Sequence, residues 1–117
     1  MRIITYNVNG IRAAIAKGFL GWLAQADADI ICLQEIKARV SQIPLMEFEM
    51  LGYHHFWFPA KKKGYSGVAI LSKSEPDEVV YGMNGHYSDE EGRFIRVDIA
   101  GCTFASVYVP SGSSGEI

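Results

Sequence analysis

The first third of the chain contains an extended segment, a helical segment and a second extended segment. Residues 2–8 (RIITYNV) are rich in β-branched and aromatic side chains, which predicts a strand. Residues 11–26 place apolar side chains at helical spacing, which predicts an amphipathic helix weakened by Gly18 and Gly21. Residues 29–34 (DIICLQ) are nearly all apolar, the pattern of a strand covered on both faces. A strand–helix–strand unit normally has parallel strands, so we expect both strands to end at one edge of a sheet.

The remainder of the chain is dominated by segments with a period of two. A short helix is predicted at residues 44–51, with Ser41 as a candidate cap and Gly52 as its stop. Five alternating segments follow, separated by turns rich in Gly, Pro, Asn and Asp: YHHFWFP, GVAILSK, EVVYGM, RFIRVDIA and CTFASVYVP. This order predicts an α+β fold, in which an antiparallel meander follows the strand–helix–strand unit.

The composition is that of one globular domain over residues 1–117. Apolar residues make up 49% of the chain and charged residues 21%, which is ordinary for a soluble domain. No apolar run approaches the roughly 20 residues that a membrane-spanning helix needs, and the amino terminus lacks the features of a signal peptide. We therefore expect a cytoplasmic protein without a membrane partner. Cys32 and Cys102 lie in apolar strand-like segments, and we expect both to be reduced core thiols.

The net charge of −2 argues against binding of nucleic acid through bulk positive charge. Release of counterions rewards clustered Lys and Arg, so local clusters matter more than the total. The clear cluster is Lys61, Lys62 and Lys63, directly before Gly64. Considered alone, this cluster is most simply a solvated turn between strands.

Polar residues stand where the two expected parallel strands end. Glu35 follows the apolar segment of residues 29–34 directly, and Asn7 and Asn9 end the first strand. A carboxylate at the end of a buried strand must be solvated, paired or bound to a cation, and such oxygen ligands suit Mg²⁺. The alternatives are a surface carboxylate for Glu35 and a strand-ending turn for the asparagines. Composition does not separate these interpretations.

Tyr108 lies near the end of the last expected strand, in VYVPSG. A phenol there could donate a hydrogen bond to a phosphoryl oxygen or, with a pKa lowered by a cation, transfer a proton. The simpler alternative is an aromatic strand residue whose hydroxyl reaches water. His54, His55 and His86 show neither metal-ligand spacing nor a nearby nucleophile motif, and we assign them no catalytic role.

Five motifs occur in a fixed order over essentially the whole chain: ITYNVNGIRA, ICLQEIK, GYSGVAILSK, EGRFIRVDI and SVYVPSG. This series resembles the exonuclease III, or abasic-site (AP) endonuclease, family of the endonuclease–exonuclease–phosphatase superfamily. The resemblance implies the amino-terminal half of a two-layer, DNase I-like α/β sandwich. It also implies a Mg²⁺-dependent DNA-repair phosphodiesterase, with Mn²⁺ as a substitute. Such an enzyme cuts double-stranded DNA on the 5′ side of abasic sites and removes nucleotides from 3′ ends.

The resemblance also implies roles for individual residues. Glu35 would bind the metal and Asn7 would help to form the metal and phosphate site. Asn9, at a family position held by Asp or Asn, and Tyr108, in the Y-x-P motif, would belong to the catalytic network. Contacts to the metal site or the DNA backbone would come from Lys37, Lys61, Lys62, Lys63, Tyr65 and Ser66. Ser111 stands where the family usually has Asn or Gln.

Two further motifs of that family, Asp-x-Asn and Ser-Asp-His, do not occur in the chain. We therefore expect residues 1–117 to be the amino-terminal portion of one domain, with the carboxyl-terminal half as a partner, and to have little nuclease activity alone. We also expect the inner apolar face of GVAIL and FIRVDI to be exposed to water without that half.

Two other functions remain open. One is a phosphatase or phospholipid-cleaving enzyme of the same superfamily, which would share Asn7 and Glu35. The other is a truncated half-domain without catalysis. GYSGVAILSK and VYVPSG favour the DNA-repair branch.

Overall fold

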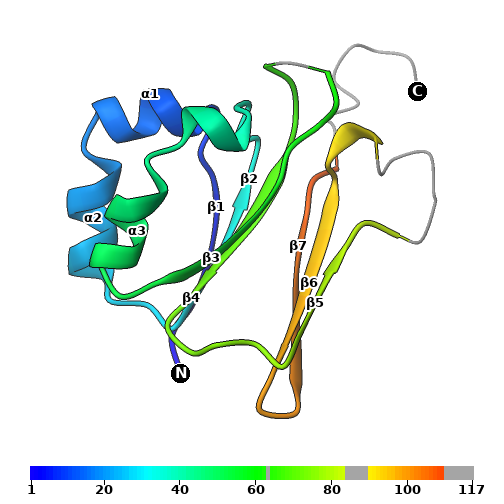
Figure 1. The fold of residues 1–117 in the computed structure, drawn as a ribbon. Helices are drawn as coiled ribbons and strands as arrows, with labels where there is room; N and C mark the ends of the chain where they lie inside the picture. The colour runs from blue at the N-terminus through cyan, green and yellow to red at the C-terminus, as the bar shows by residue number, and fades with distance from the viewer. Residues whose placement is uncertain (63, 84–89, 110–117) are drawn as a thin grey trace.

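The computed structural model describes residues 1–62, 64–83 and 90–109, and it arranges them as a layer of helices, a first sheet and a second sheet (Figure 1). The elements in chain order are β1 (Ile3–Asn7), α1 (Ile11–Ala16), α2 (Phe19–Ala26), β2 (Ile30–Gln34), the 3-10 turn η1 (Val40–Gln42), α3 (Leu45–Met50), β3 (His54–Phe58), β4 (Val68–Ser72), β5 (Glu78–Tyr81), β6 (Phe94–Ile99) and β7 (Cys102–Val107). None of the helices in the described ranges is long and apolar enough to cross a membrane.

The first sheet has the strand order β1-β2-β4-β3. β1 pairs with β2 in parallel, from Ile3 opposite Ile30 to Asn7 opposite Gln34. β4 pairs antiparallel with both β2 and β3. The predicted parallel strand–helix–strand unit is confirmed, and it brings the ends of β1 and β2 to one edge of the sheet.

The helical segment expected at residues 11–26 is divided into α1 and α2. Gly18 lies between them with a φ of 103°, a left-handed conformation that glycine adopts without steric cost and that interrupts the helix. The apolar spacing is nevertheless used as predicted. Ile11, Phe19 and Leu23 are buried against the face of the first sheet that points away from the second sheet (Figure 1).

α3 lies within the predicted segment. Pro44 precedes it, and Gly52, with a φ of 89°, follows its end. The prediction that Ser41 caps this helix is wrong, because Ser41 lies inside η1 and no side chain caps α3. Phe48 anchors the helix by packing edge-on against Trp57 of β3, with 5.2 Å between ring centroids.

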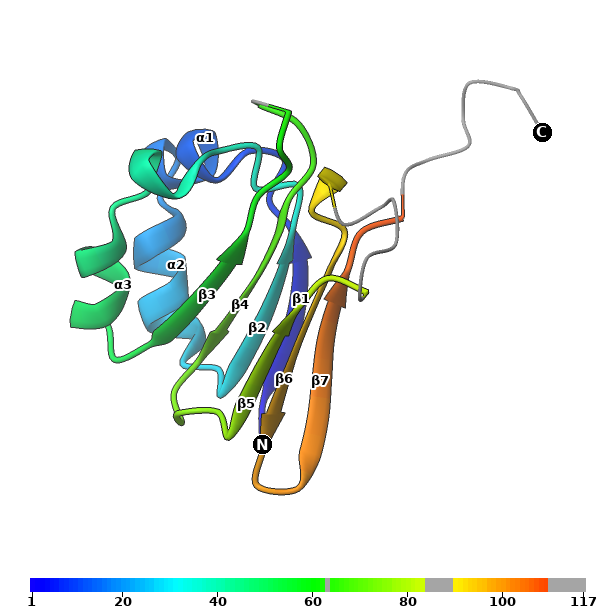
Figure 2. The same cartoon turned by 45° about the vertical axis from the view of Figure 1, so that its right-hand side comes forward.

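β5, β6 and β7 form a separate antiparallel sheet in that order (Figure 2). All five alternating segments contain strands, but the prediction of one continuous meander is wrong. β3 and β4 join the first sheet, and the chain changes sheet between β4 and β5. Alternation with a period of two determines which face a strand buries, and it carries no information about the strand's partner.

The two sheets pack face to face through their apolar sides. Ile30, Val68 and Ile70 of the first sheet and Ile95 and Val97 of the second form one cluster, and each is at most 2% exposed. We expected the inner face of GVAIL and FIRVDI to be exposed to water, and this expectation is wrong. The chain contributes strands to both layers, so each sheet covers the other.

The two cysteines lie in different surroundings. Cys32 is 6% exposed between the sheets, and this burial raises the pKa of its thiol to about 11. Cys102 begins β7 and is exposed, so the prediction of a core thiol is wrong for this residue. Cys102 is exposed although its segment is rich in apolar residues, because it lies at the end of the strand next to the turn at residues 100–101.

Only Cys102 should react with a thiol reagent in the native chain, because the thiolate is the reactive form and Cys32 resists ionisation. Titration with an aromatic disulfide near pH 8 should show one fast thiol in the native protein and a second only in denaturant. Cys102→Ser should remove the fast phase and Cys32→Ser should leave it. A fast phase that survives Cys102→Ser would contradict the placement of Cys32.

Gly64 and Gly67 provide a matched test of packing in the loop before β4. Both have a left-handed backbone, with φ of 74° and 92°. A Cβ on Gly67 would lie 2.5 Å from Cγ1 of the buried Ile36, whereas a Cβ on Gly64 would meet nothing within 4 Å. Each alanine variant should lose about 1 kcal/mol of unfolding free energy to backbone strain. Gly67→Ala should lose a further ~1–3 kcal/mol to overpacking. If urea unfolding gives the same loss of unfolding free energy for both variants, the side chain of Ile36 can move aside without cost, and the predicted overpacking is wrong.

Candidate active site

The ends of β1 and β2 form the base of the candidate site. Asn7 is the last residue of β1, and Glu35 follows β2 directly. The Val8 N–H donates to the Gln34 carbonyl at 3.0 Å, and the Gly10 N–H donates to the Glu35 carbonyl at 2.7 Å. The predicted placement of Asn7 and Glu35 at one edge of the sheet is therefore confirmed.

Backbone strain is concentrated at this edge. Of the six residues other than glycine with a left-handed φ in the described ranges, four lie here: Asn9 (49°), Glu35 (55°), Lys37 (51°) and Ser66 (49°). Each such residue costs on the order of 1 kcal/mol, so the surrounding structure must hold it in place. The Ile36 N–H donates to the Gly67 carbonyl at 3.2 Å, and the Lys37 N–H donates to the Ser66 carbonyl at 2.9 Å. Strain of this kind is characteristic of functional sites.

Tyr108 reaches this edge from the second sheet. Its hydroxyl donates to Oε2 of Glu35 at 2.9 Å, and its N–H donates to the Arg93 carbonyl at 2.8 Å. Burial, followed by the hydrogen bond to Glu35 and the charge of Glu35, raises the pKa of Tyr108, and Arg93 opposes this effect. The phenol is therefore protonated near neutral pH and serves as a donor. The lowered pKa considered from the sequence would require a cation beside the phenol.

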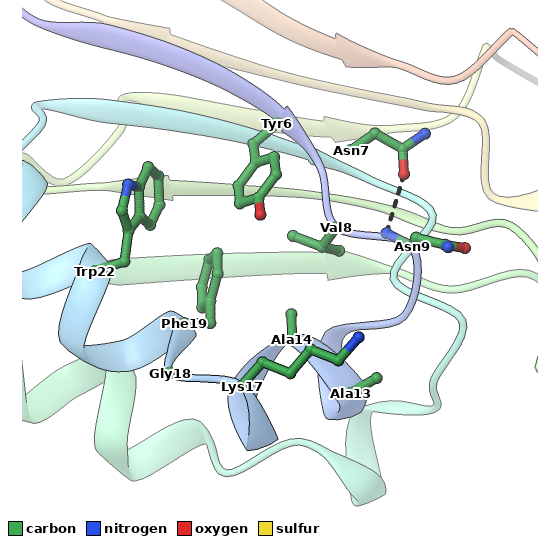
Figure 3. Close-up of a pocket in the computed structure, with 10 residues that line it drawn as sticks. All are labelled: Tyr6, Asn7, Val8, Asn9, Ala13, Ala14, Lys17, Gly18, Phe19 and Trp22. Atoms are coloured by element: carbon green, nitrogen blue, oxygen red, sulfur yellow. Dashed lines mark hydrogen bonds between the residues drawn. The ribbon is translucent and has the colours of Figure 1, made fainter.

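The two asparagines and Lys37 form a chain of hydrogen bonds. The Asn9 N–H donates to Oδ1 of Asn7 at 3.0 Å, as Figure 3 shows. Nζ of Lys37 donates to Oδ1 of Asn9 at 2.7 Å. A cation already engages the side-chain oxygen of Asn9, which makes Asn7 the better placed of the two for a second cation.

The oxygen donors at this edge fit Mg²⁺. Glu35 offers a carboxylate that accepts one hydrogen bond, from Tyr108, and Asn7 offers a carbonyl oxygen with a second lone pair. Within the described ranges, no three His, Cys, Asp or Glu residues gather as a metal site. This donor set suits a hard cation that takes one protein carboxylate and completes its shell with water and phosphate oxygen.

The loop between β3 and β4, called the lysine loop because it carries Lys61 and Lys62, borders the same edge. The hydrogen bond from the Lys37 N–H to the Ser66 carbonyl joins the loop to this edge. Nζ of Lys61 lies 3.4 Å from Oε1 of Glu90, an exposed ion pair of little energy. Nζ of Lys62 lies 5.3 Å from the ring centroid of Tyr65, which is itself exposed. Both lysines can therefore exchange these partners for an anion.

The position of Ser66 does not support the prediction that its hydroxyl contacts the substrate. Ser66 is 2% exposed, and its hydroxyl has no hydrogen-bond partner among the residues that the structure describes. In this structure Ser66 shapes the loop through its carbonyl and does not present its hydroxyl to a substrate. Lys63 and Ser111 lie outside the described residues.

Two cations near this site were not identified from the sequence, Arg12 on α1 and Lys17 directly after it. Arg12 lines a hollow of about 370 Å³ together with Gly10 and Lys37. A second hollow, of about 440 Å³, lies beside the end of β1 and is lined by aromatic rings, Asn9 and Lys17 (Figure 3). Arg12 and Lys17 are exposed and have no ion-pair partner within the described part of the chain. The position of Arg12, directly after NVNGI, was the available signal.

Known proteins share this arrangement. The model of the endonuclease/exonuclease/phosphatase family matches residues 4–114. An exodeoxyribonuclease of Bacillus subtilis is 44% identical over 116 residues, which cover 98% of this chain and 45% of that protein. The structure of an AP endonuclease from Archaeoglobus fulgidus aligns with a TM-score of 0.83 and 38% identity, over 94% of this chain and 41% of that one. The 3′ phosphatase NExo from Neisseria, bound to a product DNA hairpin, aligns with a TM-score of 0.81 and 33% identity, over 92% and 41%.

The chain thus spans less than half the length of these relatives. The expected fold class is confirmed, because AP endonucleases and exonucleases share this α+β arrangement of sheets and helices. The family match covers the strand ends that carry Asn7, Glu35 and Tyr108. The chain belongs to the endonuclease/exonuclease/phosphatase family.

Proposed function

We propose that this chain carries the metal-binding and phosphate-binding side of a Mg²⁺-dependent DNA-repair phosphodiesterase. The observation that carries the proposal is the hydrogen bond from Tyr108 to Glu35, which brings a proton donor and a ligand carboxylate from two sheets to one point. The relatives named exodeoxyribonuclease and AP endonuclease support this class. The substrate would be double-stranded DNA, cut on the 5′ side of abasic sites and shortened at 3′ ends.

Glu35 and Asn7 are the residues that would hold the metal, and the same oxygen donors would accept Mn²⁺ in place of Mg²⁺. The bound cation supplies positive charge that stabilises the negative charge developing on the phosphate. Lys37, anchored on Asn9 at 2.7 Å, adds a second positive charge at the same edge.

Tyr108 contributes a hydrogen-bond donor opposite these groups. In the free chain its hydroxyl donates to Glu35 at 2.9 Å. When a phosphate is bound, the same hydroxyl can turn to a non-bridging oxygen, where charge develops as water attacks in line. One charged acceptor replaces another, so the exchange costs little.

Activation of the attacking water requires another group. Among the described residues, no aspartate or histidine is hydrogen-bonded to the side chains of Asn7, Asn9, Glu35 or Tyr108. We propose that the carboxyl-terminal half of the longer proteins supplies it and that residues 1–117 alone turn over slowly. Loss of a general base typically lowers the rate by about 10²- to 10⁴-fold.

Exposed cations would guide the DNA backbone to this site. Arg12 lies on α1 and Lys17 directly follows it, and Lys61 and Lys62 lie on the loop after β3. Neutralised phosphates release counterions, so a few well-placed cations suffice in a chain with a net charge of −2.

A 3′-phosphatase activity is a second candidate for the same site. The Neisseria neighbour that shares this fold is named a 3′ phosphatase and is bound to a DNA hairpin. Both reactions place a phosphate between the metal ligands and a hydrogen-bond donor, so this half of the site serves either. Release of inorganic phosphate from a 3′-phosphorylated duplex distinguishes this activity from backbone cleavage.

Removal of the ligand charge should abolish Mg²⁺-dependent cleavage of an abasic-site duplex. Under single-turnover conditions with protein in excess, Glu35→Gln should lose at least about 100-fold and Tyr108→Phe about 10- to 1000-fold. Glu49→Gln is the matched control, because Glu49 is paired with His55 away from the site. If Glu35→Gln cleaves at the rate of the unmodified protein, the assignment of Glu35 as a metal ligand is wrong. Fast cleavage by the unmodified 1–117 chain would show that no further half is required.

The exposed cations around the site, on and directly after α1 and on the lysine loop, should determine the salt dependence of DNA binding. Alanine substitution of Arg12, Lys17, Lys61 or Lys62 should each reduce the slope of log K against log salt by up to about one. Lys73→Ala should leave the slope unchanged, because Lys73 lies at the opposite edge of the sheet. Its side chain pairs with Asp27, and its backbone N–H donates to the Asp29 carbonyl. Fluorescence anisotropy at several salt concentrations measures these slopes. Unchanged slopes in all four variants would show that these residues are solvated surface residues that do not contact the DNA backbone.

A further inference from the structure

A polar link joins the two sheets directly beneath the candidate active site. The side-chain amide of Gln34 donates to the hydroxyls of Thr5 and Ser106, each at 3.0 Å. The Ser106 hydroxyl in turn donates to the carbonyl of Leu33 at 2.8 Å. Ser106 lies in β7 and is only 1% exposed, so the bonds of its hydroxyl between β2 and β7 are shielded from water, whereas Thr5 at the other end of the link is exposed.

Each group in the link has a fixed role. Nε2 of Gln34 also lies 3.3 Å from the carbonyl of Cys32, which can only accept, so the amide must present its N–H groups here. The single proton of Ser106 is donated to Leu33, so its oxygen must accept from Gln34. With the amide reversed, its oxygen would face the Cys32 carbonyl, which has no proton to donate.

The remainder of the contact between β2 and the second sheet is apolar. Ile30 and Cys32 of β2 cluster with Ile95, Val97 and Phe104. Such contacts are non-directional and tolerate small shifts along a strand. Hydrogen bonds weaken steeply when their geometry is lost, so the link sets the position of β7 along β2.

We propose that Gln34 and Ser106 are positioning residues that hold the Tyr108 hydroxyl within hydrogen-bonding distance of Glu35. Gln34 immediately precedes Glu35, and Ser106 stands two residues before Tyr108. A shift of β7 at Ser106 is therefore transmitted to the phenol. The catalytic consequence rests on the proposed function, but the hydrogen bond itself is testable without turnover.

A double-mutant cycle measures the interaction that the link is proposed to maintain. Tyr108→Phe, Glu35→Ala and the double variant are unfolded in urea, and their coupling is expressed as a factor in the unfolding equilibrium constant. A hydrogen bond to a carboxylate should give roughly 10-fold coupling. In the Ser106→Ala background the coupling should fall below about 2-fold. Ser106→Thr retains the hydroxyl and should restore it.

Ser72→Ala is the matched control. Ser72 is 0% exposed, donates to the Ser74 carbonyl at 2.8 Å, and lies opposite Ile30 at the far end of β2. Its loss should lower stability about as much as Ser106→Ala and leave the coupling intact. Full coupling in the Ser106→Ala background would overturn the proposal. If Ser106→Ala does not fold, Gln34→Met breaks the link from β2 and is judged by the same criterion.

Single-turnover cleavage separates this inference from the proposed function. If both hold, Ser106→Ala lowers the cleavage rate constant with little change in DNA affinity, because the cations around the site are untouched. If Glu35→Gln cleaves at the unmodified rate, the proposed function fails and the coupling result stands by itself. If cleavage requires Glu35 but the coupling survives Ser106→Ala, the positioning role fails.

Discussion

Glu35 must leave a buried strand and turn its carboxylate toward a second sheet within one residue. Its left-handed backbone makes this turn, and main-chain hydrogen bonds hold it on both sides, from Gly10 to the Glu35 carbonyl and from Ile36 to Gly67. The bonds come from two loops that are distant in sequence. The rest of the site depends on this turn, because it brings the carboxylate to the hydroxyl of Tyr108, at the edge where Asn7 ends β1.

Local patterns predicted the elements well because burial leaves a direct trace in composition. The apolar run at residues 29–34 became β2, and parallel pairing with β1 then placed Asn7 and Glu35 at one edge without further information. Gly18 divided the expected helix, since a local apolar period does not reveal a left-handed break. The presence of each element was thus predictable, while its exact ends were less so.

Long-range contacts were predictable only in part. A period of two was assigned to the segments of both β4 and β6, yet they lie in different sheets, and β4 is buried on both faces. The distance from Tyr108 to Glu35 could therefore not be obtained from periodicity. Charge showed a similar limit. A run such as Lys61 and Lys62 is visible in the sequence, whereas Arg12 and Lys17 become neighbours of the site only when α1 folds against β1.

The separation of 73 residues between Glu35 and Tyr108 also concerns synthesis on the ribosome. The first sheet is complete in the nascent chain once β4 has emerged, but its apolar face, with Ile30, Val68 and Ile70, waits for β5, β6 and β7. During that interval Glu35 has no phenol beside it, and the chain presents a surface suited to chaperones. Docking of the second sheet ends both conditions at once. The hydrogen bond from Tyr108 to Glu35 therefore forms in the same step that buries this apolar face.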